Sequence, residues 1–248
     1  MDADRPVTVF RALHHGRAPE DPLVLPGPWD AASARVFAEA GFPALATPSL
    51  GVAASLGYED GSTPPDEMFA AVARIVRAVS TGDTPPVPVS ADIEDGYGLA
   101  PAELVERLLA TGAVGCNLED SAGGRLKDPR QQADRLAEVR AAAGDALFVN
   151  ARVDTFLRGV PDPAAAIARA RLYVAAGADC VYPIAVPREA IPALRAGIEG
   201  PLNVWAAPGD PAEFAGLGRL GATRVTFGPG LQRQAMAAVR ESAARLRG

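Results

Sequence analysis

The stretch "LLATGAVGCNLE" (residues 108–119) contains the pattern on which the fold prediction depends. A leucine- and alanine-rich segment ends at Gly112, and an apolar run follows at once and finishes on a carboxylate. Glycine accepts the left-handed conformation that ends helices, and the run after it has the length of a buried strand. The stretch is therefore predicted to form a helix, a tight turn and a strand.

The same order of helix, glycine and strand recurs along the chain. It is repeated in "FAEAGFPALAT" (37–47), "YVAAGADCVYPI" (173–184) and "GRLGATRVTFG" (218–228). Units of this kind place parallel strands side by side through crossover helices. We predict strands at residues 23–27, 44–47, 87–93, 113–119, 146–152, 179–184, 202–206 and 223–228. Eight strands with helices between them predict a (β/α)8 TIM barrel.

The competing arrangement is a doubly wound open sheet. Its dinucleotide-binding form carries Gly-x-Gly-x-x-Gly after the first strand, and "LVLPGPWD" (23–30) lacks that pattern. No linker or low-complexity segment divides the chain, so we predict a single domain over residues 1–248, with residues 1–22 as an N-terminal leader segment.

Two connections differ from the rest in length and composition. "PSLGVAASLGYEDGSTPP" (48–65) is predicted to be the longest uninterrupted loop, and loops of that length are usually functional or mobile. "DSAGGRLKDP" (120–129) is polar and lacks apolar anchors, so it is predicted to act as a lid. The lid residues of interest are Gly123, Gly124, Arg125 and Lys127.

Composition excludes several classes of partner. The formal net charge is −6 and the basic residues are scattered, which argues against binding to nucleic acid. No apolar stretch is long enough to span a bilayer, and "MDADRPVTVF" (1–10) lacks the pattern of a signal peptide. Cys116 and Cys180 lie in apolar runs and are interpreted as reduced core residues of a cytoplasmic protein.

An acidic cluster, "VSADIEDGYG" (89–98), follows a short apolar run and contains no lysine or arginine. The C-terminal ends of barrel strands meet on one side, so Asp92 and Glu94 are expected to face Glu119 from the next strand. Such carboxylates repel one another unless a cation lies among them. Oxygen ligands with no cysteine or histidine nearby favour Mg²⁺, or Mn²⁺, over zinc.

A purely structural interpretation of these acids needs no metal. Asp95 and Asp120 could cap the helices that follow them, and Asp92 could pair with Arg152. We favour capping for Asp95 and Asp120, and metal binding for Asp92, Glu94 and Glu119.

Other polar residues are predicted at the same end of the barrel. Arg152 follows the fifth strand, and its planar, permanently charged group could bind a substrate carboxylate. Asn203, at the seventh strand, is a further candidate for substrate binding. A general acid or base is not evident: the candidates are Tyr58, Tyr182, Ser49 and a metal-bound water.

The motifs together resemble the isocitrate lyase/phosphoenolpyruvate mutase superfamily. The resemblance runs in family order from about Leu23 and is carried by "PGPWDAASARVFAEAGFPALAT", "GVAASLGYEDG", "VPVSADIEDGYG", "GAVGCNLEDS", "FVNARVDTFL" and "LGATRVTFGPGLQRQAMAAV". It implies a (β/α)8 barrel that binds Mg²⁺ and acts on small 2-oxo or 2-hydroxy carboxylates through a metal-stabilised enolate. It also implies a homo-oligomer, a dimer or tetramer in which a C-terminal helix is exchanged.

The resemblance also implies roles for individual residues. Asp92 would contact the metal, Glu94 and Glu119 would hold it largely through water, and Asp60 would lie near the same shell. Arg152 would bind the substrate. The backbone amides around Pro48, Ser49 and Leu50 would bind a carboxylate or phosphonate.

The chain also departs from the family pattern. The lid has neither the Lys-Lys-Cys-Gly-His-type motif of isocitrate and methylisocitrate lyases nor the Lys-x-Asn element of the mutases. Pro48 replaces a small hydroxyl residue, which removes one backbone donor.

The leading hypothesis is an Mg²⁺-dependent carbon–carbon lyase, decarboxylase or acyl hydrolase. The alternatives are a phosphoenolpyruvate mutase or phosphonopyruvate hydrolase, a phosphate-binding barrel based on "FGPG" (227–230), and a non-catalytic barrel that binds metal and carboxylate.

Overall fold

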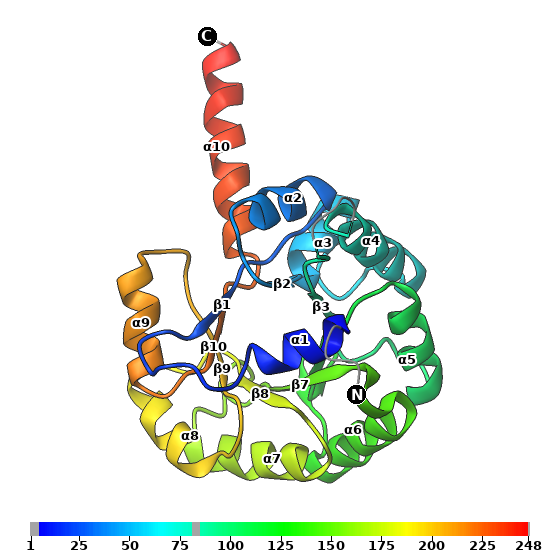
Figure 1. Cartoon of the computed structure of the whole chain (residues 1–248), viewed down its shortest axis with the longest axis vertical. Coiled ribbons are helices and arrows are strands. Elements are labelled where there is room, and N and C mark those ends of the chain that lie inside the picture. The colour runs from blue at the N-terminus through cyan, green and yellow to red at the C-terminus, as the bar shows by residue number, and fades with distance from the viewer. Residues whose placement is uncertain (1–4, 81–84, 248) are drawn as a thin grey trace.

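Eight parallel strands follow one another around a ring in the computed structural model, which describes residues 5–80 and 85–247 (Figure 1). The strands are β1 (Leu23–Leu25), β2 (Leu45–Ala46), β3 (Val89–Asp92), β4 (Gly115–Glu119), β7 (Phe148–Val153), β8 (Cys180–Pro183), β9 (Asn203–Trp205) and β10 (Arg224–Thr226). Each lies within or next to a predicted strand.

The ring is closed by hydrogen bonds between its first and last strands. The strands pair in parallel in the orders β2-β3-β4-β7-β8 and β1-β10-β9. A bridge between Val181 and Leu202 joins β8 to β9. The amide of Ala46 donates to the carbonyl of Pro26, at 3.1 Å, and joins β2 to β1. The prediction of a (β/α)8 barrel is confirmed.

An outer layer of helices covers the barrel (Figure 1). It contains α2 (Ala31–Glu39), α4 (Pro65–Ala78), α5 (Pro101–Ala110), α6 (Pro129–Ala143), α7 (Pro163–Ala175), α8 (Ile191–Gly197) and α9 (Pro211–Arg219), with short 3-10 turns at Gly144–Ala146 and Arg188–Ala190. The larger hydrophobic core lies between these helices and the strands. A smaller apolar cluster joins residues of β1, β2, β7 and β8 to the segment that precedes β1.

Part of the leader segment closes the N-terminal end of the barrel. Helix α1 (Pro6–Ala12) lies across the barrel in Figure 1, and its Phe10 is completely buried. The ring of His14 stacks on that of Phe148, with 4.2 Å between ring centroids. Burial lowers the pKa of His14 to about 3, so this imidazole is a neutral packing group. The open end of the barrel is therefore the opposite one.

Two connections are more ordered than the sequence predicted. The predicted loop at residues 48–65 contains helix α3 (Ser49–Leu56), which ends at Gly57 with a φ of 87°. The predicted lid contains an antiparallel hairpin, β5 (Ser121–Ala122) and β6 (Arg125–Leu126). The prediction of an uninterrupted loop was wrong because the alanine-rich run after Pro48 can form two helical turns.

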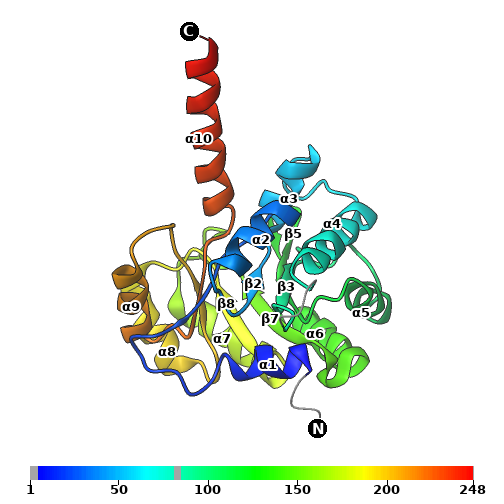
Figure 2. The same ribbon diagram turned by 45° about the horizontal axis from the view of Figure 1, so that its top comes forward.

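The last helix, α10 (Gly230–Arg247), extends away from the barrel (Figures 1 and 2). None of its described residues is buried, and Val239 and Leu246 are 56% and 89% exposed. Among residues 5–80 and 85–247, no helix combines the length and apolar character required to cross a bilayer.

Candidate active site

Strand register brings the predicted metal and substrate residues to the open end of the barrel. Asp92 lies opposite Asn117 in the β3–β4 pair, and Glu119 lies opposite Arg152 in the β4–β7 pair. Asp92, Glu119 and Arg152 line a cavity of about 210 Å³, which we call the rim cavity, and Asp60 lines it as well. Parallel strands place all these side chains at one end because their C-termini coincide.

A second cavity of about 520 Å³ adjoins the rim cavity and shares Asp60, Glu119, Arg152 and Leu157 with it. It lies beside the β5–β6 hairpin, so we call it the hairpin cavity. Glu94 lines the hairpin cavity rather than the rim cavity. The predicted metal ligands therefore surround the junction of the two cavities.

Arg152 is buried between two carboxylates. Its Nε and one terminal nitrogen donate to the two oxygens of Asp154, at 2.6 and 3.1 Å, and its other terminal nitrogen pairs with Glu119. Asp92 forms no ion pair with Arg152 among the described residues. The alternative pairing of Asp92 with Arg152, which we did not favour, is therefore absent among these residues, and Glu119 and Asp154 clamp Arg152 instead. This clamp fixes the plane of the guanidinium.

The clustered carboxylates hold protons more tightly than isolated ones. Burial, followed by the charges of Asp92 and Asp60, raises the pKa of Glu94 to about 7. Burial also raises the pKa of Glu119 to about 9, against the opposing effect of Arg152. The pKa of Asp92 is raised by burial too, although Arg152 and a hydrogen bond from Asn117 oppose the rise. Arg152 alone therefore does not offset the burial and mutual repulsion of these carboxylates.

The turn after β3 has a strained backbone. Glu94 and Tyr97 have φ values of 52° and 56°, a region that residues other than glycine rarely adopt. The amide of Glu119 donates to the carbonyl of Glu94 at 2.8 Å, which holds the turn against β4. Glu94 Oε1 and the Tyr97 hydroxyl are buried without a hydrogen-bond partner in the part of the chain that is described.

The donor set at the junction suits a hard cation. Glu94 has a buried oxygen without a partner among the described residues, and the pKa values of Asp92 and Glu94 are raised, so a cation among these carboxylates would stabilise their ionised forms. No three His, Cys, Asp or Glu side chains within residues 5–80 and 85–247 are grouped so that all could hold one ion directly. Mg²⁺ fits such a site because it uses one or two carboxylates and fills its other positions with water and substrate.

The first turn of α3 forms another wall of the rim cavity. Pro48 is the N-cap of α3, and Pro48, Ser49 and Leu50 all line the cavity. The amides at the start of a helix have no partner within the helix, so those of Ser49 and Leu50 are suited to an anion. Pro48 itself has no amide hydrogen. Apolar side chains of Leu50, Leu157 and Ile184 complete this side of the cavity.

Two predicted site residues lie outside both cavities. The hydroxyl of Tyr58 donates to Glu67 at 2.6 Å on the surface. Asn203 is completely buried inside the barrel, where its Oδ1 accepts from the hydroxyl of Thr226. Tyr182, in contrast, lines the rim cavity, and burial raises the pKa of its hydroxyl to about 12. Of the tyrosines considered, it is the one that can reach a bound substrate.

The hairpin has an exposed tip and a fixed base. Gly123 and Gly124 line the hairpin cavity and have φ values of 53° and 78°, whereas Arg125 is exposed. Lys127, at the base, pairs with Asp95 at 3.3 Å.

Asp120 is completely buried and holds the base of the β5–β6 hairpin to the barrel. It accepts hydrogen bonds from the amide of Asp154 at 2.7 Å, the hydroxyl of Tyr173 at 2.8 Å and Arg169 at 2.9 Å. Arg169 also donates to the carbonyl of Lys127 at 2.9 Å. We call this set the base clamp.

Expected helix caps at Asp95 and Asp120 are corrected by the structure. The N-cap residues of α5 and α6 are Ala100 and Asp128. Asp95 instead accepts from the amide of Tyr97, at 3.1 Å, within its own turn. Both acids begin loops that are too long for them to reach the next helix.

Sequence reasoning missed several residues near the site, among them Asn117, Arg169 and Tyr173. Asn117 was recognisable, because it is two positions before Glu119 and therefore faces the same side of its strand. Arg169 and Tyr173 lie on α7, one turn apart, and look like ordinary helix residues. Only the packing of α7 against β7 brings them to Asp120.

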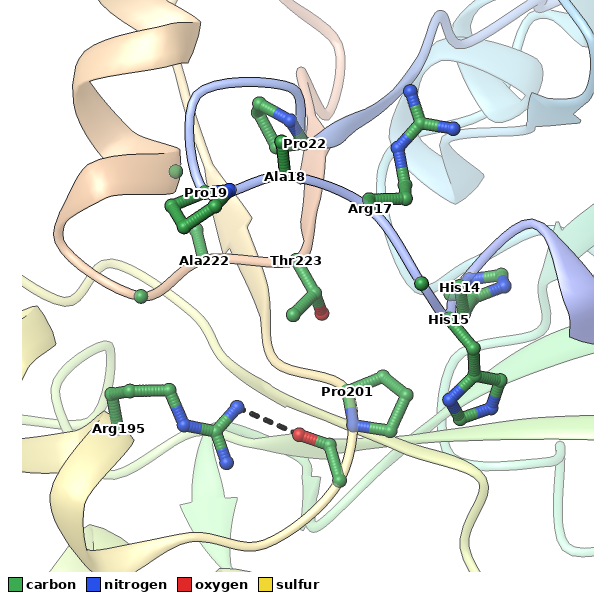
Figure 3. Close-up of a pocket in the computed structure, with 14 residues that line it drawn as sticks. His14, His15, Arg17, Ala18, Pro19, Pro22, Arg195, Pro201, Ala222 and Thr223 are labelled. Atoms are coloured by element: carbon green, nitrogen blue, oxygen red, sulfur yellow. Dashed lines mark hydrogen bonds between the residues drawn. The ribbon is translucent and has the colours of Figure 1, made fainter.

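A separate cavity of about 330 Å³ lies at the N-terminal end of the barrel, against the leader segment (Figure 3). Its Arg195 donates to the carbonyl of Gly200 at 2.7 Å, so this arginine is occupied by the backbone. None of the described residues that line this cavity is a carboxylate. Active sites of such barrels lie at the other end, and the rim cavity remains the candidate.

Similar proteins agree with this assignment. A family model described as phosphoenolpyruvate phosphomutase matches residues 10–247. An uncharacterised protein of Mycobacterium tuberculosis is 36% identical over 221 residues, which cover 88% of this chain and 81% of that protein.

Two solved structures are similar over nearly the whole chain. One, from Burkholderia cenocepacia J2315 and described as a candidate phosphonomutase, is 39% identical with a TM-score of 0.88, and covers 99% of this chain and 100% of its own. The other is 2,3-dimethylmalate lyase, which is 29% identical with a TM-score of 0.82, over 98% of this chain and 87% of its own. The relatives with named activities are lyases, mutases and hydrolases. With its barrel fold and its match over residues 10–247, the chain belongs to the phosphoenolpyruvate mutase/isocitrate lyase superfamily.

Proposed function

We propose that the protein is an Mg²⁺-dependent lyase that breaks or forms a carbon–carbon bond next to the carboxylate of a small 2-oxo or 2-hydroxy acid. The observation that carries the proposal is the rim cavity, in which Asp92, Glu119 and Asp60 surround a single clamped arginine, Arg152. Its volume of about 210 Å³ is below the range of drug-sized sites and suits a small metabolite.

Mg²⁺ would be held by Asp92 directly and by Glu94 and Glu119 through water. When bound, the ion would supply the positive charge that an enolate oxygen needs as the carbon–carbon bond breaks. Mn²⁺ has similar oxygen preferences and could substitute for it. Asp60, which lines both cavities, would accept a hydrogen bond from one of the metal's waters.

The chain's own residues would orient the substrate acid and transfer a proton to it. Arg152, held flat by Glu119 and Asp154, would bind the carboxylate next to the reacting carbon. The amides of Ser49 and Leu50 would bind the same group from α3. Tyr182 lines the rim cavity and, like an ordinary tyrosine, is protonated at neutral pH, so we propose it as the proton donor on grounds of position.

The lining of the rim cavity favours carbon–carbon over carbon–phosphorus chemistry. A phosphonate carries two negative charges and needs several donors, whereas Leu50, Leu157 and Ile184 offer an apolar wall. Such a wall suits an alkyl group on the carbon that leaves. The likeness to 2,3-dimethylmalate lyase supports this choice. The likeness to the Burkholderia protein described as a phosphonomutase supports the runner-up, a phosphoenolpyruvate mutase or phosphonopyruvate hydrolase.

The test has a binding arm and a catalytic arm. Oxalate resembles the enolate of pyruvate, so calorimetry should show that oxalate binds only with Mg²⁺ and that Arg152→Met abolishes binding. Purified protein is then assayed with alkyl-substituted malates, oxaloacetate and phosphonopyruvate. If phosphonopyruvate is the one acid turned over, with release of phosphate or conversion to phosphoenolpyruvate, the runner-up replaces the lyase proposal. Tight oxalate binding without turnover of any of these acids would favour the non-catalytic alternative.

We also propose that the protein is a homo-oligomer, a dimer or tetramer, assembled through α10. The helix has no buried residue and projects from the barrel, and its base adjoins a surface lined by Trp29, Val36 and Met236. A helix with exposed apolar residues is more stable when a second copy covers them. Sedimentation of the whole chain should give a dimer or tetramer, and a chain ending at residue 229 should give a monomer.

A further inference from the structure

The hairpin cavity contains a cation that the proposed reaction does not yet use. Arg158 lines this cavity together with Glu94, Glu119 and Arg152. Apart from Arg152, it is the only positively charged residue that lines either cavity at the open end, within the part of the chain that is described.

The position of Arg158 is fixed from both sides. Its backbone amide donates to the carbonyl of Asp154 at 2.8 Å. Its Nε donates to the hydroxyl of Ser121 at 3.1 Å, and that hydroxyl in turn donates to Asp154, which clamps Arg152. Ser121 and Asp154 thus connect the two arginines.

The outer nitrogens of Arg158 are available to a ligand. No carboxylate lies within ion-pair distance of Arg158 among the residues that the structure describes, although acids crowd the same cavity. The other nearby basic side chains are already engaged or lie outside: Lys127 pairs with Asp95, and Arg125 is exposed and does not line the cavity. A guanidinium held through Nε presents two terminal N–H groups in one plane, which is the geometry that a carboxylate accepts.

We propose that Arg158 binds a second carboxylate of the substrate, so that the site selects dicarboxylic over monocarboxylic acids. This inference rests on the proposed function. The first carboxylate would lie in the rim cavity against Arg152, and the second would extend into the hairpin cavity, on the fragment that leaves. Leu157 lines both cavities.

The experiment compares two acids that differ in one group. Malate and 2-hydroxybutyrate have the same carbon chain, but malate ends in a carboxylate where 2-hydroxybutyrate ends in a methyl group. Calorimetry with Mg²⁺ should show that the wild type binds malate about 10- to 100-fold more tightly, the range of a hydrogen-bonded charge pair. Arg158→Gln should remove this preference and leave oxalate affinity unchanged, and Arg158→Lys should retain part of it.

Two controls make the result specific. Arg125→Gln removes a nearby positive charge outside the cavity and should change neither preference nor affinity. An unchanged thermal unfolding midpoint for Arg158→Gln shows that the variant is folded. A preference for malate that survives in Arg158→Gln, or that is absent from the wild type, would overturn the assignment. Failure of oxalate to bind would instead count against the proposed function. If the preference for malate still depended on Arg158 in that case, the assignment of the second anion site would remain supported.

Discussion

Replacing Asp92 by asparagine should separate the metal site from the fold. The substitution keeps the shape of a side chain that is nearly buried at the end of β3, and it removes one of the charges that raise the pKa of Glu94. In the metal-free protein it should be neutral or slightly stabilising, because it reduces repulsion among the clustered acids. In the presence of Mg²⁺ it should be harmful, because the direct ligand is lost.

The size of the effect follows from linkage between binding and folding. Mg²⁺ at one hundred times its dissociation constant stabilises a protein by about 2.7 kcal/mol. For a chain of 248 residues this corresponds to a rise of roughly 5–10 °C in the unfolding midpoint. Asp92→Asn should show almost none of this rise.

The same shift should depend on pH. The pKa of Glu94 in the folded protein, about 7, is higher than that of an unfolded glutamate, so the metal-free folded state binds the proton more tightly. This contribution to stability is present in full at a pH below the ordinary pKa of a glutamate, about 4.3, and it is lost as the pH rises through about 7. Mg²⁺ competes with the proton, so its stabilising effect should be larger at pH 8 than at pH 6.

Differential scanning calorimetry with Mg²⁺ and with EDTA, at both pH values, measures all these quantities. Glu67→Gln is a suitable control, since Glu67 accepts from Tyr58 on the surface and lies outside both cavities. The reasoning would be refuted if Asp92→Asn kept the full Mg²⁺ shift, or if the wild-type shift were the same at pH 6 and pH 8.

Three further substitutions test other parts of the structure. Tyr173→Phe removes one hydrogen bond to Asp120 in the base clamp and should cost about 1 kcal/mol, with faster hydrogen exchange at the hairpin base by mass spectrometry. Proline at both Gly123 and Gly124, whose φ values of 53° and 78° proline cannot adopt, should reduce turnover more than Mg²⁺ affinity, and an unchanged rate would mean that the tip is only a connection. Arg224→Met should raise the free energy of unfolding by about 1–4 kcal/mol in urea titrations, because a buried charge is replaced by an apolar chain of similar length.

The prediction for Arg224 depends on an unusual feature of the barrel interior. Arg224 is completely buried, and none of its three guanidinium nitrogens has a hydrogen-bond partner among the described residues. Burial lowers its pKa. If Arg224→Met instead lowers the free energy of unfolding, the argument that this buried charge is destabilising is refuted.

The fold was predictable because it depends on local, repeated signals. Each glycine after an alanine-rich segment, such as Gly112 and Gly177, has positive φ and ends a helix before a buried strand. The ends of those strands then determined which acids could meet. The order in which Asp92, Glu119 and Arg152 appear around the barrel follows from the topology alone.

What the sequence could not reveal is which charged groups pair. Arg152 had several acids within reach along the rim, and the choice of Glu119 and Asp154 depends on strand register and on side-chain direction. The base clamp was equally hidden, because Arg169 and Asp120 are 49 residues apart. Helix α3 was not predicted because the glycines and prolines around it are typical of a loop, whereas the run at residues 49–56 has enough helical propensity for two turns.

The strained turn after β3 links these observations. A non-glycine residue at positive φ costs about 1–3 kcal/mol and persists only where its surroundings hold it. At Glu94 the hydrogen bond from the amide of Glu119 supplies that restraint. The Glu94 carboxylate then has one buried oxygen without a partner among the described residues, and its pKa is about 7. Burial and repulsion both oppose ionisation of these carboxylates. The proposed cation at the junction of the two cavities would offset both effects, and we infer that the strained turn holds Glu94 in place for it.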